Sequence, residues 1–364
     1  VDFTNGFTEV YGDPLGLKAS WEGYVNYTDH QATRRAQALS RNAQWFEDHS
    51  PVDARFKKPL CRGVSAKVIN AAILGGDLYP SSAIGINLPN SNWVRAEHGS
   101  KSVTIANLTH AYDEAARGNG FRNEFADSTQ TVSLMDRYGS VCDDLHTDLH
   151  ECLGHGSGRL LPGVDPDALK AYGSTIEEAR ADLFGLYYLA DEKLVELGLT
   201  PCQEAYKAQC YSYMMNGLLT QMVRIQPGHQ IEEAHMRNRA LIARWTLEHY
   251  PQAVRLSEQD GKHYVEILDY PLLRTAFGTL LAEIQRIKSE GDLQAARQMV
   301  ERYGVQIDAK LHQEVLERYS KLNLAPYKGF INPRYTPIYD QEGHITDVHI
   351  DYLETYDEQM LRYS

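Results

Sequence analysis

The chain has 364 residues, of which 43% are hydrophobic and 23% charged, and a formal net charge of −13. This composition is typical of a globular protein large enough for two lobes. The absence of a Lys/Arg-rich run argues against a nucleic-acid partner, because phosphate neutralisation needs a basic patch. The longest apolar runs, such as "LFGLYYLA" from Leu183, are too short to cross a bilayer. Five cysteines without a C-x-x-C pair are typical of reduced thiols in a cytoplasmic protein.

The first ninety residues predict short strands and two helices. Residues 1–27 are rich in aromatic side chains and glycine, which favours strands and turns. A polar helix with Ala, Leu and Trp on one side is expected over residues 28–50. Residues 65–77, "SAKVINAAILGGD", predict a short helix that its Gly-Gly pair ends. Residues 84–90, "IGINLPN", predict an extended segment that ends at the proline.

The rest of the chain predicts a helical array with two hairpins. Nearly all of residues 103–254 are expected to be helical, apart from a glycine-rich run after His155. "RLSEQDGKHYVEILDY" contains an Asp-Gly turn and predicts a hairpin, and two further helices follow it. The tail "YTPIYDQEGHITDVHIDY" alternates apolar and polar residues around a Glu-Gly turn and predicts a second hairpin. The expected fold class is therefore mainly α with minor β (α+β).

The stretch "DLHECLGHGSGRL" contains two histidines at an unusual spacing. His150 and Glu151 begin like the zinc-protease motif H-E-x-x-H, but the second histidine is His155, five positions after the first. On a regular α-helix, positions five apart diverge by about 140°. A one-residue π-type bulge would bring both imidazoles to one side, and Gly154 would tolerate the unusual backbone angles. Two surface histidines on an ordinary helix are the alternative that the spacing leaves open.

A third ligand for such a site is available in the helix predicted for "STIEEARADLFGLYYLA". Glu178 and Asp182 are four residues apart and therefore share one face. Glu178 could bind a metal together with the two histidines, and Asp182 could accept a hydrogen bond from a ligand histidine. Ser174 is the predicted N-cap, with Glu177 as its capping-box partner, and a supporting role for Glu177 at the site stays open. A solvated acidic face is the alternative for this helix.

The pair "HECLGHGSG" and "EEARAD" resembles the double signature of the dipeptidyl peptidase III family of zinc exopeptidases. Members of this family carry H-E-x-x-G-H and then E-E-C-R-A-E/D, whereas this chain has Ala179 for the cysteine and Cys152 where leucine is common. Further similar blocks extend over most of the chain: "GFTEVYGDPLG", "WEGYV", "GINLPN", "AHMRNRALIARW" and "IKSEGDLQAARQMVERYG". Family members are considerably longer, so the chain resembles a member that lacks the N-terminal half.

The resemblance implies one Zn²⁺ per chain, bound by His150, His155 and Glu178. It implies that Glu151 is the general base for a zinc-activated water. Supporting acids would be Glu177 and Asp182. The implied residues at the scissile carbonyl are Tyr11 and His235, and those that bind the peptide are Glu9, Asn87, Asn90, Glu22 and Arg239. The backbone of "GINLPN" would also offer a strand edge to the peptide.

The resemblance implies a zinc-dependent dipeptidyl peptidase, a metalloprotease of the aminopeptidase type. Such an enzyme releases dipeptides from the free N-terminus of short peptides, and the expected location is the cytoplasm. Because the chain does not begin with Met, the presence of a targeting signal before residue 1 is left open. A helical zinc lobe is expected from residues 28–70 and 118–333, with a cleft between it and a substrate-binding lobe from residues 1–27, 71–117 and 334–364. Two alternatives remain: a zinc aminopeptidase or endopeptidase with the same core, and a non-catalytic peptide-binding fragment. The N-terminal half of the same protein is a further expected partner, whereas nucleic acid and membrane are not.

Overall fold

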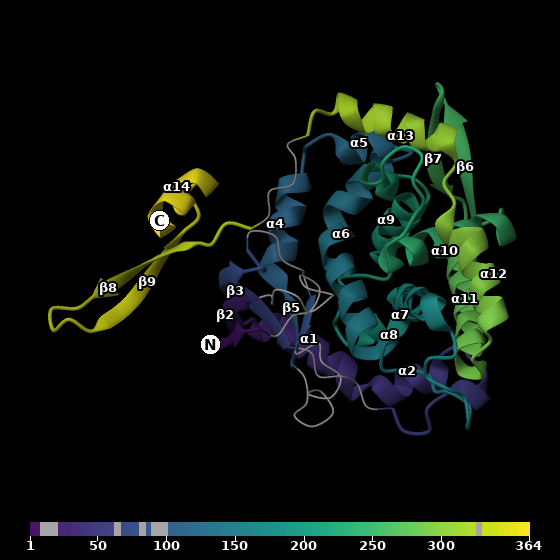
Figure 1. Cartoon of the computed structure of the whole chain (residues 1–364), viewed down its shortest axis with the longest axis horizontal. Helices are drawn as coiled ribbons and strands as arrows, with labels where there is room; N and C mark the ends of the chain where they lie inside the picture. The colour runs from purple at the N-terminus through teal and green to yellow at the C-terminus, as the bar shows by residue number, and fades with distance from the viewer. Residues whose placement is uncertain (8–20, 62–66, 80–84, 89–100, 325–329) are drawn as a thin grey trace. The chain divides into compact units, whose positions relative to one another are not determined.

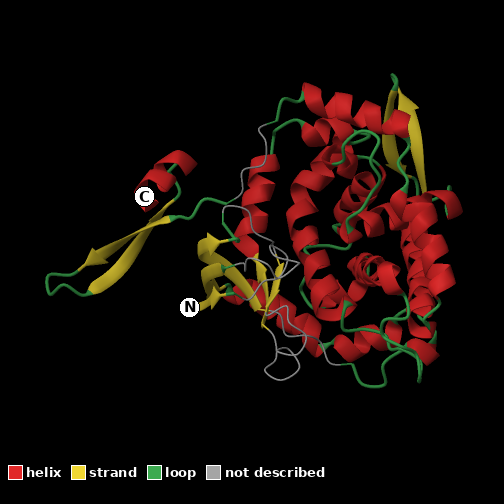
Figure 2. Cartoon of the chain, in the orientation of Figure 1, coloured by secondary structure: helices red, strands yellow, loops and turns green. Residues whose placement is uncertain are grey.

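The computed structural model describes the chain except for five short segments; the described residues are 1–7, 21–61, 67–79, 85–88, 101–324 and 330–364. Helices predominate among them and strands are short (Figure 2), which confirms the predicted fold class. The residues form two compact units: the first comprises 1–34, 66–115 and 325–364, and the second comprises 35–65 and 116–324. Their roles as substrate lobe and zinc lobe remain predictions. Within the described ranges, every helix is too short or too polar to cross a membrane.

The first unit is built on a five-stranded sheet with the order β1-β2-β3-β5-β4 (Figure 1). Its strands are β1 (Asp2–Gly6), β2 (Glu22–Thr28), β3 (Lys67–Gly76), β4 (Gly85–Leu88) and β5 (Lys101–Ile105). Strands β3 and β5 are parallel, and the other neighbours are antiparallel. Apolar side chains of β2, β3 and β5 form the core of this unit together with Leu108 and Phe330. The extended segment expected around residues 84–90 is confirmed for its described part by β4.

Strand β3 occupies the segment for which the sequence predicted a short helix, so that prediction was wrong. It lies between β2 and β5 in the sheet, and Val68, Ile69 and Ala71 are almost fully buried. The side-chain amide of Asn107 bonds both the backbone N and the backbone O of Ala71, each at 2.9 Å. Pairing on both sides of the strand therefore outweighs the helix propensity of its alanine and leucine residues.

The first unit is completed by helix α4 (Ala106–Ala116), whose last residue belongs to the second unit, and by a C-terminal hairpin and helix. The hairpin consists of β8 (Arg334–Tyr339) and β9 (Ile345–Asp351), as predicted, and α14 (Tyr356–Tyr363) follows it. The side-chain amide of Asn332 holds the C-terminal segment to β3, because it bonds Leu74 N at 2.7 Å and Leu74 O at 3.0 Å.

The second unit is a helical array around α7 (Gly173–Leu189). This helix packs against α6 (Thr129–Leu149), α9 (Tyr206–Leu218), α10 (Ala234–His249) and α11 (Tyr270–Glu290), and Figure 1 shows it among them. Side chains on all sides of α7 are buried, Ile176, Leu183 and Leu186 among them. A helix with buried side chains on all sides lies inside a protein. The acidic residues of α7 are therefore carried into the interior of this unit.

Shorter elements complete the second unit. The hairpin of β6 (Val254–Gln259) and β7 (Lys262–Ile267) is the predicted one, and its turn residues Asp260 and Gly261 both have positive φ, as a type I′ turn requires. Two segments are π-helical, η2 (His150–Gly154) and η5 (Glu301–Val305). The other elements are α1 (His30–Arg41, which begins in the first unit), α2 (Ala43–His49), η1 (Ala54–Phe56), α5 (Phe121–Phe125), η3 (Lys170–Tyr172), α8 (Glu192–Glu196), η4 (Thr220–Arg224), α12 (Leu293–Val300) and α13 (Ala309–Lys321).

Candidate metal centre

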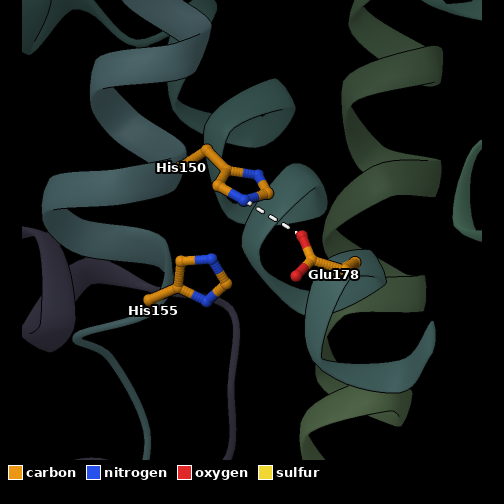
Figure 3. A group of neighbouring side chains, drawn as sticks. All are labelled: His150, His155 and Glu178. Carbon is orange, nitrogen blue, oxygen red and sulfur yellow. Dashed lines mark ion pairs between the residues drawn. The ribbon is translucent and has the colours of Figure 1, made fainter. Parts of the chain in front are cut away.

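The turn that carries the two histidines is π-helical, as the spacing predicted. The backbone N–H of His155 donates to the carbonyl O of His150, five residues earlier, at 3.0 Å. The two imidazole rings are perpendicular, with centroids 4.6 Å apart. Figure 3 shows both rings facing Glu178. The local distortion therefore absorbs the extra residue and brings both histidines to one side.

Gly154 permits this turn through its lack of a side chain. Its φ is not positive, so the turn does not use the left-handed backbone angles that favour glycine. A Cβ at Gly154 would lie 2.9 Å from the Cα of Ala181 and 3.0 Å from its carbonyl O, closer than real Cβ atoms approach backbone. The π turn thus lies directly against the backbone of α7, the helix that carries the acidic residues of the site.

Three side chains converge in front of this turn. His150, His155 and Glu178 each offer one ligand atom, and these atoms lie within 4.8 Å of one another. The distance from His150 Nε2 to Glu178 Oε2 is 3.2 Å. Ligand atoms around a tetrahedral zinc lie about 3.3 Å apart when the metal bonds are about 2.0–2.1 Å long. Two imidazole nitrogens and one carboxylate oxygen, one pair of them at 3.2 Å and all within 4.8 Å, are a ligand set that suits a divalent metal of the zinc type.

The Oε2 atom of Glu178 is the least satisfied group of the site. It is buried and makes no hydrogen bond of good geometry, and its nearest polar neighbours are two imidazole nitrogens, His150 Nε2 at 3.2 Å and His235 Nε2 at 3.4 Å. A buried carboxylate oxygen without a well-placed donor is costly, because it has lost its water. A cation held between Glu178 and the two histidines would remove this cost.

The second ring nitrogen of each histidine is fixed by a carboxylate. His150 Nδ1 donates to Asp182 Oδ1 at 2.7 Å, and His155 Nδ1 donates to Glu177 Oε1 at 2.7 Å. These bonds set the tautomer of each ring and leave its Nε2 as the atom that can bind a metal. The predicted hydrogen bond of Asp182 is therefore present, and Glu177 makes the equivalent bond.

The capping box predicted for Ser174 and Glu177 is absent. Helix α7 begins at Gly173, one residue before Ser174, and its N-cap position makes no side-chain capping bond. The capping box does not form because the Glu177 carboxylate bonds to charged side chains instead. A local capping pattern is worth only about 1 kcal/mol, and a buried carboxylate gains more from charged donors.

Two cations that the sequence did not single out hold Glu177 in place. Arg180 bonds both carboxylate oxygens, with Nη2 2.7 Å from Oε1 and Nε 3.0 Å from Oε2, and Lys288 Nζ pairs with Oε2. Burial alone would raise the pKa of Glu177, but Arg180, His155 and Lys288 lower it well below its usual range. Arg180 could have been found from its i,i+3 spacing on the same helix, whereas Lys288 comes from α11 and carries no local signal.

The surrounding acids give the site a negative potential. Burial disfavours a charged imidazole, but the carboxylates of Asp182, Glu178 and Glu151 raise the pKa of His150 to about 10. A field that favours a proton on His150 also favours a metal cation beside it. Glu151 itself is half-buried, and within the described ranges no hydrogen bond or ion pair occupies its carboxylate.

His235 lies beside this group at the start of α10. Its Nε2 is 3.4 Å from Glu178 Oε2, and its Nδ1 donates to Glu233 Oε1 at 2.6 Å. Glu233, which the sequence analysis missed, also caps α10 by accepting from the backbone N–H of His235. Arg239 follows one turn later, and its charge is one of those that lower the pKa of Asp182 against the effect of burial.

The structure does not describe the side chains of most of the other predicted site residues. Glu9, Tyr11 and Asn90 lie outside the described residues, and only the backbone of Asn87 is described, in β4. Glu22 is buried in β2 and belongs to the first unit. Cys152, inside the histidine motif, is fully buried and forms no disulfide, and its burial disfavours reaction with dissolved reagents.

Comparison with known proteins decides the family. The profile of peptidase family M49 matches residues 1–171 and 167–323. The chain belongs to this family of metallopeptidases. It is similar to dipeptidyl peptidase 3 of Dictyostelium discoideum, with 28% identity over 242 residues that cover 56% of this chain and 33% of the relative. For dipeptidyl peptidase 3 of Rattus norvegicus the identity is 25% over 346 residues, or 84% of this chain and 46% of the relative. The chain thus spans less than half the length of these relatives.

Solved structures of the same family share the fold. DPP III from Caldithrix abyssi aligns with a TM-score of 0.73 and 22% identity, over 88% of this chain and 59% of that protein. Dipeptidyl-peptidase III from Corallococcus sp. strain EGB aligns with a TM-score of 0.66 and 26% identity, over 88% of this chain and 57% of that protein. The resemblance found in the sequence is therefore confirmed at the level of family and fold.

Replacement of Gly154 by alanine should weaken metal binding and the packing of η2 together. The new methyl group would overlap the backbone of Ala181, so η2 must move away from α7, and overpacking of this kind costs about 1–3 kcal/mol. We expect a lower melting temperature and a larger zinc dissociation constant, measured by competition with a chelator. Gly139→Ala on α6 is the matched control, because a Cβ there meets nothing closer than 3.9 Å. An unchanged zinc affinity in Gly154→Ala would contradict this account of the turn.

Proposed function

We propose that this chain carries the metal centre of a zinc-dependent dipeptidyl peptidase, which releases dipeptides from the free N-terminus of short peptides. The observation that carries the proposal is the convergence of the His150 and His155 imidazoles and the Glu178 carboxylate, whose ligand atoms lie within 4.8 Å of one another. Membership of family M49 and similarity to relatives named dipeptidyl peptidase 3 support it.

One zinc ion would be held by His150, His155 and Glu178. Bound there, it would supply Lewis acidity, which lowers the pKa of a water molecule and polarises a carbonyl. Asp182 and Glu177 hold both histidines as Nδ1–H tautomers, so each Nε2 keeps its lone pair for the metal. This arrangement explains why each ligand histidine has its own buried acid behind it.

Glu151 would be the general base. Its carboxylate is not engaged by any other described residue, so an oxygen is available to take the proton of the attacking water. The same oxygen would then deliver that proton to the nitrogen of the leaving amine. His235, whose pKa the Glu233 carboxylate raises, would donate a hydrogen bond near the reacting carbonyl, and Tyr11 would do the same.

The peptide would be bound through its backbone and its terminal ammonium group. Within the described part of the sheet, β4 is an edge strand, and an edge strand can pair with an extended peptide. Asn87 lies in β4. Glu9, Asn87 and Asn90 would bind the ammonium group, and Glu22 and Arg239 are further candidates for contact with the peptide. Because the ammonium group would be fixed, its distance from the zinc would decide how many residues are released.

Glu151→Gln should abolish hydrolysis and leave the metal bound. The amide cannot accept the proton of water, and loss of a general base typically costs about 10²- to 10⁴-fold in rate. The measurement is kcat on Arg-Arg-arylamide together with zinc content by elemental analysis. Glu196→Gln, an exposed residue of α8, is the control and should keep full activity. Full activity in Glu151→Gln would mean that another group takes the proton.

The size of the released product should separate this proposal from its alternatives. We expect hydrolysis of Arg-Arg-arylamide and little hydrolysis of arylamides of single amino acids, measured as released arylamine. Release of single residues only would identify an aminopeptidase, and cleavage within N-terminally blocked peptides would identify an endopeptidase. Peptide binding with zinc present and no hydrolysis would identify a non-catalytic peptide-binding protein.

A further inference from the structure

Behind His150, the Asp182 carboxylate is the centre of a buried hydrogen-bond network. Its Oδ1 accepts from His150, and its Oδ2 accepts from the Tyr213 hydroxyl at 2.7 Å and from Asn238 Nδ2 at 3.0 Å. Tyr213 lies on α9 and Asn238 on α10, so the network joins four elements: η2, α7, α9 and α10. Asp182, Tyr213 and Asn238 are all buried.

The two oxygens of Asp182 have separate tasks. The terminal torsion of an aspartate is soft, so one hydrogen bond to His150 would leave the carboxylate plane free to turn. Tyr213 and Asn238 approach the other oxygen from two different helices and thereby fix this plane. The direction of Oδ1, and with it the direction of the His150 Nδ1–H bond, is then fixed as well. A rotation of the imidazole would move its Nε2 away from Glu178.

The environment of Asn238 supports a specific task for its amide. Its Nδ2 donates to Asp182, but its Oδ1 is buried and has no donor among the described residues. A leucine of similar size would avoid this unsatisfied oxygen. The opposite orientation of the amide would place Oδ1 against the Asp182 carboxylate, which is repulsive. The bond to Asp182 is therefore what the asparagine contributes here.

The Tyr213 hydroxyl is held in its protonated form, in which it can donate to Asp182. Burial, the Asp182 charge and the hydrogen bond to it raise the pKa of Tyr213 well above its usual value. The hydroxyl therefore keeps its proton for Asp182. Tyr213 also contacts the ring of His146, one turn before His150, edge-on with centroids 5.6 Å apart.

We infer that Tyr213 and Asn238 are positioning residues for the metal centre, because they fix the Asp182 carboxylate that orients the His150 imidazole toward Glu178. This inference rests on the proposed zinc site. Neither residue lies in the two motifs that mark the site in the sequence, and neither hydrogen-bonds a proposed ligand directly. Their effect on the metal passes through Asp182.

Tyr211 provides a matched control on the same helix. It is as deeply buried as Tyr213, and its hydroxyl donates to the carbonyl O of Val265 at 2.9 Å and accepts from Asp127 N at 2.9 Å. These hydrogen bonds lead away from Asp182. Loss of the Tyr211 hydroxyl should therefore reduce stability without any effect on the His150 ring.

The test compares Tyr213→Phe, Asn238→Leu and Tyr211→Phe in the full chain. Loss of a partner that orients a ligand typically weakens metal binding by about 10- to 100-fold. We expect Tyr213→Phe and Asn238→Leu each to raise the zinc dissociation constant about tenfold, measured by chelator competition. The visible absorption spectrum of the Co²⁺ derivative should shift in both variants, because it reports the geometry of the ligands. Tyr211→Phe should lower the melting temperature and leave both readouts unchanged.

A double-variant cycle tests the route through Asp182. In an Asp182→Asn background, Tyr213→Phe should add little further loss of zinc affinity, because residues in one network are not additive. Fully additive losses would overturn the route through Asp182. Wild-type zinc affinity and an unshifted Co²⁺ spectrum in either Tyr213→Phe or Asn238→Leu would overturn the role of that residue. A parent chain that binds no zinc would overturn the proposed function, and this inference with it.

Discussion

The candidate metal centre depends on one backbone hydrogen bond, from His155 N to His150 O. A regular helix would bond each N–H four residues back and would place these two imidazoles on divergent faces. The bond to the fifth residue forms a single π turn, which brings both rings to the same side, opposite Glu178. The turn can exist here because Gly154 has no side chain and lies against the backbone of Ala181. Local backbone geometry and core packing thus create the site together.

Helix α7 shows how a protein interior can hold three carboxylates within six residues. A buried charge is tolerated when it is paired and hydrogen-bonded. Glu177 meets this condition through Arg180, Lys288 and His155, and Asp182 meets it through His150, Tyr213 and Asn238. Glu178 differs, since its buried Oε2 makes no hydrogen bond of good geometry and has only the imidazole nitrogens of His150 and His235 nearby. The carboxylate with the weakest hydrogen bonding is therefore the one that lies beside the two histidines, where a cation would fit.

Features that depend on spacings within a short stretch of sequence were predictable, whereas features that depend on contacts between distant segments were not. The convergence of His150, His155 and Glu178 and the hydrogen bond of Asp182 follow from spacings within two short motifs, so they were predictable. The capping box was also a local pattern, but Glu177 bonds to Arg180 and Lys288 instead, and the lysine is far away in the chain. Strand β3 was predicted as a helix because its alanine and leucine residues favour one. Its pairing with β2 and β5, which decides its structure, cannot be inferred from its own residues. Tyr213 lies in none of the quoted sequence blocks, and Asn238 lies in "AHMRNRALIARW" without a local signal for its role. Only the fold brings the two residues to Asp182.

The proposed ligands lie on helical elements of the second unit rather than on surface loops. Substitutions in the packing around these elements can therefore change the site. The positions of His150 and Glu178 are set by the contact of η2 with α7, and the orientation of His150 is set by groups from α9 and α10. A site held this way is rigid, because core packing determines its geometry. The metal affinity that we propose for this site would therefore depend on side chains that do not touch the metal. A core substitution that leaves the helices folded can still change the binding of the ion, through the angle of a single imidazole.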